Sequence, residues 1–120
     1  MARVFLVIGV LLVLAGVLWP SPDEPPPPQV DPQSLRYTTA GPVQGFRTGE
    51  DTFVWRGIPF AAPPQGDLRW RRPHLPEPWT EPREALEFAA PCVQFWSPLS
   101  GVPGAEGELV GSEDCLYLNI

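Results

Sequence analysis

The apolar residues of this chain form three successive patterns. Positions 4–19 are an apolar run of sixteen residues without a charge, directly after Arg3. A proline-rich stretch follows. From position 33 onward, short apolar stretches alternate with polar residues and turn residues, which indicates a packed region built from short strands. The pattern divides the chain into residues 1–19, 20–32 and 33–120.

Residues 1–19 are predicted to be a signal peptide or an N-terminal membrane anchor. As a helix the apolar run would span roughly 24 Å, slightly less than the ~30 Å hydrocarbon core of a bilayer. It is also slightly longer than the ~7–15 residues of a usual signal-peptide core, and no convincing small-residue cleavage site follows it. We therefore expect an exported protein that is secreted, periplasmic or anchored to the membrane. A cleaved signal peptide and an uncleaved anchor both stay open.

Residues 20–32 are predicted to be a linker. Seven of these thirteen residues are proline, which favours polyproline II and prevents helix or sheet formation. At ~3.1 Å per residue the segment reaches up to roughly 40 Å. A docking peptide for a proline-binding module is the alternative, and predicted export disfavours it.

Residues 33–120 begin with a predicted antiparallel meander. Apolar and polar residues alternate over 35–39, apolar residues recur over 43–46 and 53–55, and glycine-containing turns separate these stretches. The prolines that follow predict an irregular wrap, anchored on Leu68, Trp70 and Trp79.

Further along the chain the pattern predicts three more features. Residues 83–90 are expected to form one or two helical turns, and residues 97–111 a long surface loop. Residues 116–120 start an apolar, strand-like run with no predicted partner in the preceding sequence. We expect this run to be the entry to a larger sheet in a longer protein.

Composition and charge narrow the possible functions. Prolines and glycines make up 29 of the 120 residues, yet five tryptophans and six phenylalanines indicate that part of the chain packs. The net charge is −6 and every basic residue except one histidine is arginine. Because phosphate binding requires a basic face, this charge argues against a nucleic-acid partner.

The two cysteines, Cys92 and Cys115, are predicted to form a disulfide. An even number of cysteines in an exported domain favours pairing, and the bridge would close a loop of 22 intervening residues. A metal site would need more ligands, and His74 is the only histidine, so no metal is predicted. A free pair of thiols is the remaining alternative.

No catalytic residue is predicted in this chain. There is no G-x-S-x-G sequence, since Ser112 is followed by Glu113 and Asp114. The glycines at 101, 104 and 107 match neither a dinucleotide fingerprint nor a phosphate-binding loop, so no cofactor is implied. His74 lies in the proline-rich stretch, where an exposed loop histidine is a better interpretation than a general base.

Five motifs follow one another along residues 41–120. They are G-P-V-Q-G (41–45), F-V-W-R-G-I-P-F-A-A-P-P-Q-G-D-L-R-W-R-R-P (53–73), P-E-P-W (76–79), P-C-V-Q (91–94) and S-E-D-C-L-Y-L-N-I (112–120). Together they resemble the N-terminal portion of a type-B carboxylesterase, the family that includes the cholinesterases. The resemblance runs from about Leu35 to Ile120, and the combination of the second and fifth motifs is highly specific.

The resemblance implies an α/β-hydrolase fold, of which residues 33–120 would be the start: antiparallel meander, proline-rich wrap, disulfide-closed loop and first part of the central sheet. It implies that Cys92 and Cys115 form the family's first disulfide, near the rim of the active-site gorge. It also implies a structural ion pair between Arg69 and Glu113, and Arg71 and Arg72 are alternative partners for this carboxylate.

The function implied by the resemblance is hydrolysis of a small-molecule carboxylic ester by a serine esterase. The serine, acid and histidine of the family lie downstream, so these residues alone are expected to be inactive. Cholinesterases carry a choline-binding tryptophan in the disulfide loop, at a position that matches about Ala105, whereas the loop's only tryptophan is Trp96. A general ester is therefore favoured over a choline ester. A non-catalytic binding or adhesion relative with the same fold is the alternative.

Overall fold

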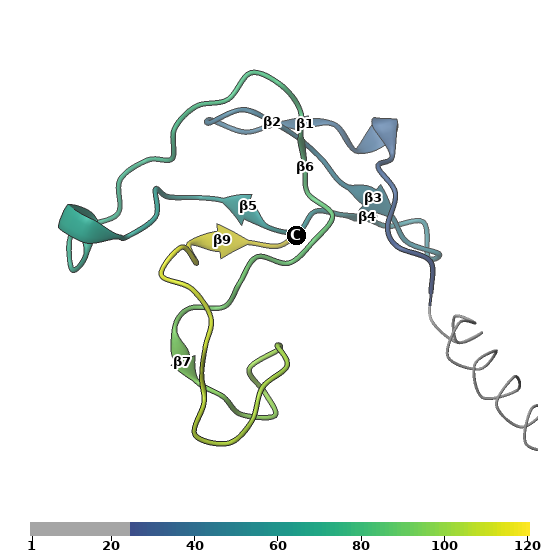
Figure 1. The fold of residues 1–120 in the computed structure, drawn as a ribbon. Helices are drawn as coiled ribbons and strands as arrows, with labels where there is room; N and C mark the ends of the chain where they lie inside the picture. The colour runs from purple at the N-terminus through teal and green to yellow at the C-terminus, as the bar shows by residue number, and fades with distance from the viewer. Residues whose placement is uncertain (1–24) are drawn as a thin grey trace, which may run out of the picture.

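The computed structural model describes residues 25–120 (Figure 1). The predicted signal or anchor segment 1–19 and the start of the linker lie outside these residues. The described part contains nine short strands and two 3-10 helices, and no α-helix. None of its helices is long and apolar enough to cross a membrane.

The elements follow one another in short steps. Their bounds are η1 (Pro32–Ser34), β1 (Arg36–Tyr37), β2 (Pro42–Gln44), β3 (Phe46–Arg47), β4 (Phe53–Val54), β5 (Ile58–Pro59), η2 (Gly66–Leu68), β6 (Arg83–Glu84), β7 (Gln94–Phe95), β8 (Leu109–Val110) and β9 (Tyr117–Leu118).

Two antiparallel pairs occupy the stretches where alternation predicts a meander. Strand β1 pairs with β2, and β3 pairs with β4. The turn between β1 and β2 is closed by Thr38, whose N–H donates to the Gly41 carbonyl at 3.0 Å and whose hydroxyl lies 2.7 Å from the same oxygen. Local turn chemistry therefore accounts for this part of the fold.

The prediction of helical turns over residues 83–90 is wrong. Residues 83–84 form β6, which adds to β2 in parallel and gives the sheet order β1-β2-β6. The Ala85 N–H donates to the Gln44 carbonyl at 2.6 Å, and the Ala85 carbonyl accepts from the Arg56 N–H at 2.8 Å. Because both backbone groups of Ala85 form hydrogen bonds with residues far away in the sequence, the segment stays extended.

The expectation that residues 116–120 have no partner is also wrong. Strand β9 pairs with β5 in antiparallel register, Ile58 opposite Leu118. The ladder continues to Ile120, which exchanges two backbone hydrogen bonds of 2.9 Å with Trp55. In Figure 1 this pair lies at the centre of the molecule, with the C-terminus beside β4.

The core lies between these strands. Val43, Trp55, Ile58 and Ala85 are buried and contact one another, and Phe53 and Trp79 pack against them. Val43 lies in β2 and Ile58 in β5, whereas Trp55 directly follows β4 and Ala85 directly follows β6. The core is thus formed by segments that lie far apart in the sequence.

A buried polar network supports the core around Ser34. Its side chain is fully buried, and its hydroxyl accepts the Gly45 N–H at 2.8 Å. The Ser34 carbonyl accepts the Trp55 indole N–H at 3.0 Å. Asp31 caps the N-terminus of η1 by accepting the Gln33 N–H, and it also pairs with Arg47. These two contacts, in that order, lower the pKa of its carboxyl. Asp31 therefore joins the end of the proline-rich linker to β3.

The proline-rich wrap is anchored by Trp79 but not by Trp70. The Trp79 ring is partly buried against the core, and its indole N–H donates to the Pro42 carbonyl at 2.7 Å. Trp70 is 97% exposed and has a left-handed backbone φ of 61°, which bulky residues rarely adopt. The prediction that Trp70 anchors the wrap is therefore wrong for the described residues, whereas Leu68 is half-buried.

Candidate functional site

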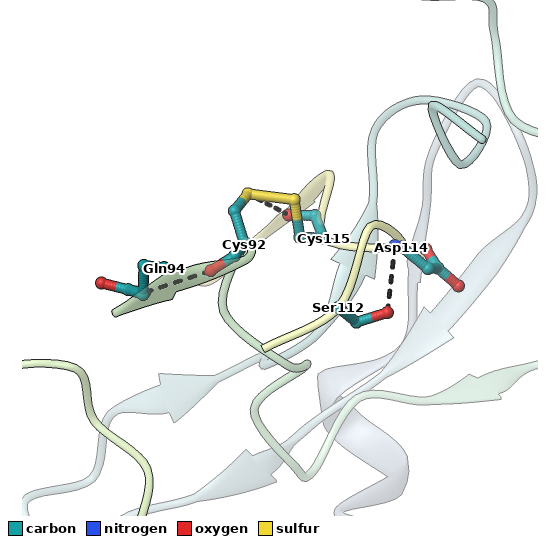
Figure 2. The surroundings of a disulfide bond; sticks show 5 residues. All are labelled: Cys92, Gln94, Ser112, Asp114 and Cys115. Atoms are coloured by element: carbon teal, nitrogen blue, oxygen red, sulfur yellow. Dashed lines mark hydrogen bonds between the residues drawn. A yellow bond between two sulfur atoms is a disulfide. The ribbon is translucent and has the colours of Figure 1, made fainter. Parts of the chain in front are cut away.

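The predicted disulfide between Cys92 and Cys115 is confirmed. The sulfur atoms are 2.04 Å apart and the Cα atoms 5.0 Å apart, which is ordinary disulfide geometry. Figure 2 shows the bridge beside Ser112 and Asp114, with the Asp114 N–H donating to the Ser112 hydroxyl at 3.1 Å. The bridge closes the loop that forms the lower lobe in Figure 1.

The two ends of this loop also meet through their backbones. The Ser112 N–H donates to the Pro91 carbonyl at 2.8 Å, and Cys92 and Ser112 form an isolated parallel bridge. Gly111 has a φ of 98°, and a Cβ atom there would lie 2.5 Å from the Pro91 carbonyl oxygen. Only glycine satisfies both the left-handed backbone and this close approach.

Inside the loop, the chain is more regular than a plain surface loop. Strand β7 pairs with β8, so that Phe95 lies opposite Leu109, and the Trp96 N–H donates to the Glu108 carbonyl at 2.7 Å. Residues 109–110 therefore belong to a strand, which corrects the prediction that all of 97–111 is loop. Phe95 and Leu109 are both exposed.

Trp96 is used within the loop itself. Its indole N–H donates to the Val102 carbonyl at 3.1 Å, and its ring lies so close to Gly104 that an added Cβ would be 2.3 Å from it. Ala105 is exposed, and its N–H donates to the Glu108 carboxylate at 2.9 Å. Trp96 therefore stabilises the conformation of the loop around residues 102–104.

Arg69 and Glu113 form an ion pair that joins the exit of the loop to the turn after η2. The hydrogen bond that Arg69 donates to the Glu113 carboxylate, followed by the attraction of that charge, raises the pKa of Arg69. Both side chains are about half exposed, 54% and 42%, so the pair is accessible to salt. The alternative partners Arg71 and Arg72 form no ion pair within residues 25–120.

Replacing Glu113 with glutamine is expected to lower the melting temperature slightly, because the charge that holds Arg69 is lost. The decrease should be larger at low salt than at high salt, since exposed pairs are screened. Differential scanning fluorimetry at two salt concentrations measures this decrease. The control is Glu77→Gln, which removes an exposed glutamate that forms no ion pair within residues 25–120. An unchanged melting temperature at low salt would contradict a stabilising role for the pair.

The adjacent Asp114 has a different neighbour. Burial is the main cause that raises the pKa of the Tyr117 hydroxyl, and the Asp114 carboxylate beside it adds to the effect. The two acids of the S-E-D-C motif thus act on different groups: Glu113 pairs with Arg69, and the charge of Asp114 acts on Tyr117.

No catalytic constellation forms among the described residues. His74 is exposed, and its carbonyl accepts the Ala62 N–H at 2.9 Å. The Ser112 hydroxyl accepts a backbone N–H, and no hydrogen bond joins it to His74. Residues 25–120 contain no group of three or more histidine, cysteine or acidic side chains placed to hold a metal ion.

Comparison with known sequences gives consistent matches. The family model described as the carboxylesterase family matches residues 32–120. Fumonisin B1 esterase of Sphingopyxis macrogoltabida is 46% identical over 90 residues, which cover 75% of this chain and 16% of that protein. Acylcarnitine hydrolase of Mus musculus is 40% identical over 105 residues, 78% of this chain and 18% of the relative. The chain therefore spans less than a fifth of the length of these relatives.

Comparison with solved structures agrees. A structure titled PNB esterase superimposes with a TM-score of 0.57 at 31% identity, over 72% of this chain and 16% of the esterase chain. A thermophilic PNB esterase gives a TM-score of 0.58 at 34% identity, over 72% and 17% of the two chains. These neighbours support the α/β-hydrolase fold class, although the described residues contribute only strands, 3-10 turns and irregular segments.

Proposed function

Since the chain belongs to the carboxylesterase family, we propose that it forms the N-terminal part of a serine hydrolase that cleaves small-molecule carboxylic esters. The observation that carries the proposal is the match of residues 32–120 to the family, with 46% identity to an esterase. In this reaction a serine attacks the ester carbonyl, the alcohol leaves, and water hydrolyses the acyl-enzyme. The residues that perform these steps belong to the remainder of the protein.

The role proposed for this segment is structural support of the disulfide loop. The bridge between Cys92 and Cys115 and the pair between Arg69 and Glu113 hold the two ends of the loop. The position of the loop near the active-site rim is inferred from the family resemblance. Through these contacts, the segment would keep the loop in one conformation relative to β5 and β9.

We further propose a general ester rather than a choline ester as substrate. The tryptophan of the loop, Trp96, is engaged with Val102 and Gly104, and Ala105 stands about where cholinesterases place their cation-binding tryptophan. Binding of a quaternary ammonium group requires an available aromatic face. The names of the relatives cover varied esters, acetylcholine among them, so the proposal of a general ester rests on Trp96 and Ala105 and not on those names.

Export of the protein remains part of the proposal. The sequence of residues 1–19 supports it, and so does the disulfide, because structural disulfides persist in oxidising compartments. We propose no cofactor and no nucleic-acid partner. Membrane attachment depends on whether residues 1–19 are retained, which mass determination of the exported protein would decide.

The proposed activity is tested on the full-length protein that carries this segment. We expect hydrolysis of p-nitrophenyl butyrate and covalent labelling by a fluorophosphonate, which reacts with activated serines. A preparation inactivated by prior fluorophosphonate treatment is the control. Absence of both hydrolysis and labelling in folded protein would refute the enzyme and support the non-catalytic relative.

A further inference from the structure

A basic cluster lies immediately after the strained turn at Trp70. Arg69 precedes this residue and pairs with Glu113, whereas Arg71 and Arg72 follow it. Within residues 25–120, the side chains of Arg71 and Arg72 form no ion pair and donate no hydrogen bond. Two uncompensated arginines stand out in a chain of net charge −6.

The turn itself supports a functional interpretation of this cluster. Trp70 adopts a left-handed conformation that costs free energy for a bulky residue. Its indole is 97% exposed, so packing of the side chain does not offset that cost. The turn does separate Arg69, which holds the loop, from Arg71 and Arg72, which border a cavity.

This cavity has a volume of about 200 Å³. Its walls combine apolar residues, including Leu68 and Leu116, with the basic residues Arg71, Arg72 and His74. No acidic side chain lines it. The charge of the arginines therefore favours an anion, while the apolar walls favour an organic group over inorganic phosphate.

We propose that this cavity binds a small organic carboxylate, with the carboxylate on Arg71 and Arg72 and the apolar group against Leu68 and Leu116. Arginine matches a carboxylate through two parallel hydrogen bonds. The cavity is smaller than the ~300–1,000 Å³ of typical drug-sized sites, so a compact acid fits. The natural ligand rests on the proposed function, because ester hydrolysis releases an acid of this class.

The test uses the full-length protein and benzoate as the probe, with isothermal titration calorimetry as the readout. We expect binding of benzoate but not of benzyl alcohol, which has the same ring without the charge. The double variant Arg71→Gln/Arg72→Gln should weaken benzoate binding by at least about tenfold, because hydrogen bonds to charged groups are lost. Arg36→Gln/Arg83→Gln removes the same charge elsewhere and should bind as the wild type.

A second variant separates loss of the site from loss of folding. Leu68→Glu places a negative charge in the cavity and should abolish benzoate binding, while Leu68→Met should preserve it. Melting temperatures of all variants are measured in parallel. Unchanged benzoate binding in Arg71→Gln/Arg72→Gln, or no binding to the wild type, would overturn the proposal. Weakening by both arginine pairs alike would also overturn it, because it would indicate only a general charge effect.

Hydrolysis of p-nitrophenyl butyrate by the same samples distinguishes this proposal from the proposed function. Benzoate binding that depends on Arg71 and Arg72 in a protein without esterase activity would support the site and refute the enzyme. Esterase activity in a protein whose benzoate binding does not depend on Arg71 and Arg72 would refute the proposed carboxylate site and leave the proposed enzyme function intact.

Discussion

Replacing Trp55 with alanine is expected to lower the free energy of unfolding by about 3 to 5 kcal/mol. Trp55 is 8% exposed and contacts Val43, Ile58 and Ala85 in the core. Its indole N–H also donates to the Ser34 carbonyl. The substitution therefore leaves both a cavity and a buried acceptor without its donor, and these costs add.

Urea unfolding of the chain, followed by circular dichroism, measures this loss. Trp70→Ala is the matched control, because it removes the same side chain from a site that is 97% exposed, and it should leave the midpoint nearly unchanged. Trp55→Phe separates the two contributions, since it keeps most of the ring and removes the donor. Equal effects at Trp55 and Trp70 would contradict the observed core.

Replacing both Cys92 and Cys115 with serine is expected to lower the free energy of unfolding by about 3 kcal/mol. The bridge joins residues 23 positions apart, and its loss restores the freedom of this loop in the unfolded chain. The folded loop keeps its other contacts, namely the β7–β8 pair and the hydrogen bond from Ser112 to Pro91. We therefore expect destabilisation without loss of the overall fold.

Urea unfolding of the double variant, compared with wild type under reducing and oxidising conditions, measures the effect of the bridge. Reduced wild type should match the double variant, because both lack the bridge. The double variant itself should be insensitive to the reductant. Wild-type stability that does not change on reduction would show that the bridge contributes little.

In functional terms, these two predictions concern different parts of the segment. Trp55 supports the junction where β5 and β9 meet the meander, and the disulfide supports the loop that extends from this junction. If the proposed function is correct, the cysteine variant of the full-length protein should lose activity mainly through changed placement of the loop. The Trp55 variant should lose activity because a smaller fraction of the protein is folded.

The sequence by itself determined the features that depend on neighbouring residues, on the number of cysteines or on family motifs. Alternation and turn residues located the antiparallel pairs β1–β2 and β3–β4, because a tight turn brings adjacent stretches together. The cysteine count led to the disulfide. The family motifs suggested the pairing of Arg69 with Glu113, which the structure places in contact.

Only the tertiary structure decided the features that depend on distant residues. Residues 83–84 became a strand because β2 supplied hydrogen-bond partners some forty residues away, and β9 paired with β5 across about sixty residues. Propensity over a short window contains no information about such partners. Trp70 and Trp79 both lie in the proline-rich stretch, yet Trp79 packs on the core and Trp70 is exposed. Burial is decided by the surfaces that the whole fold brings together, and a linear pattern does not specify them.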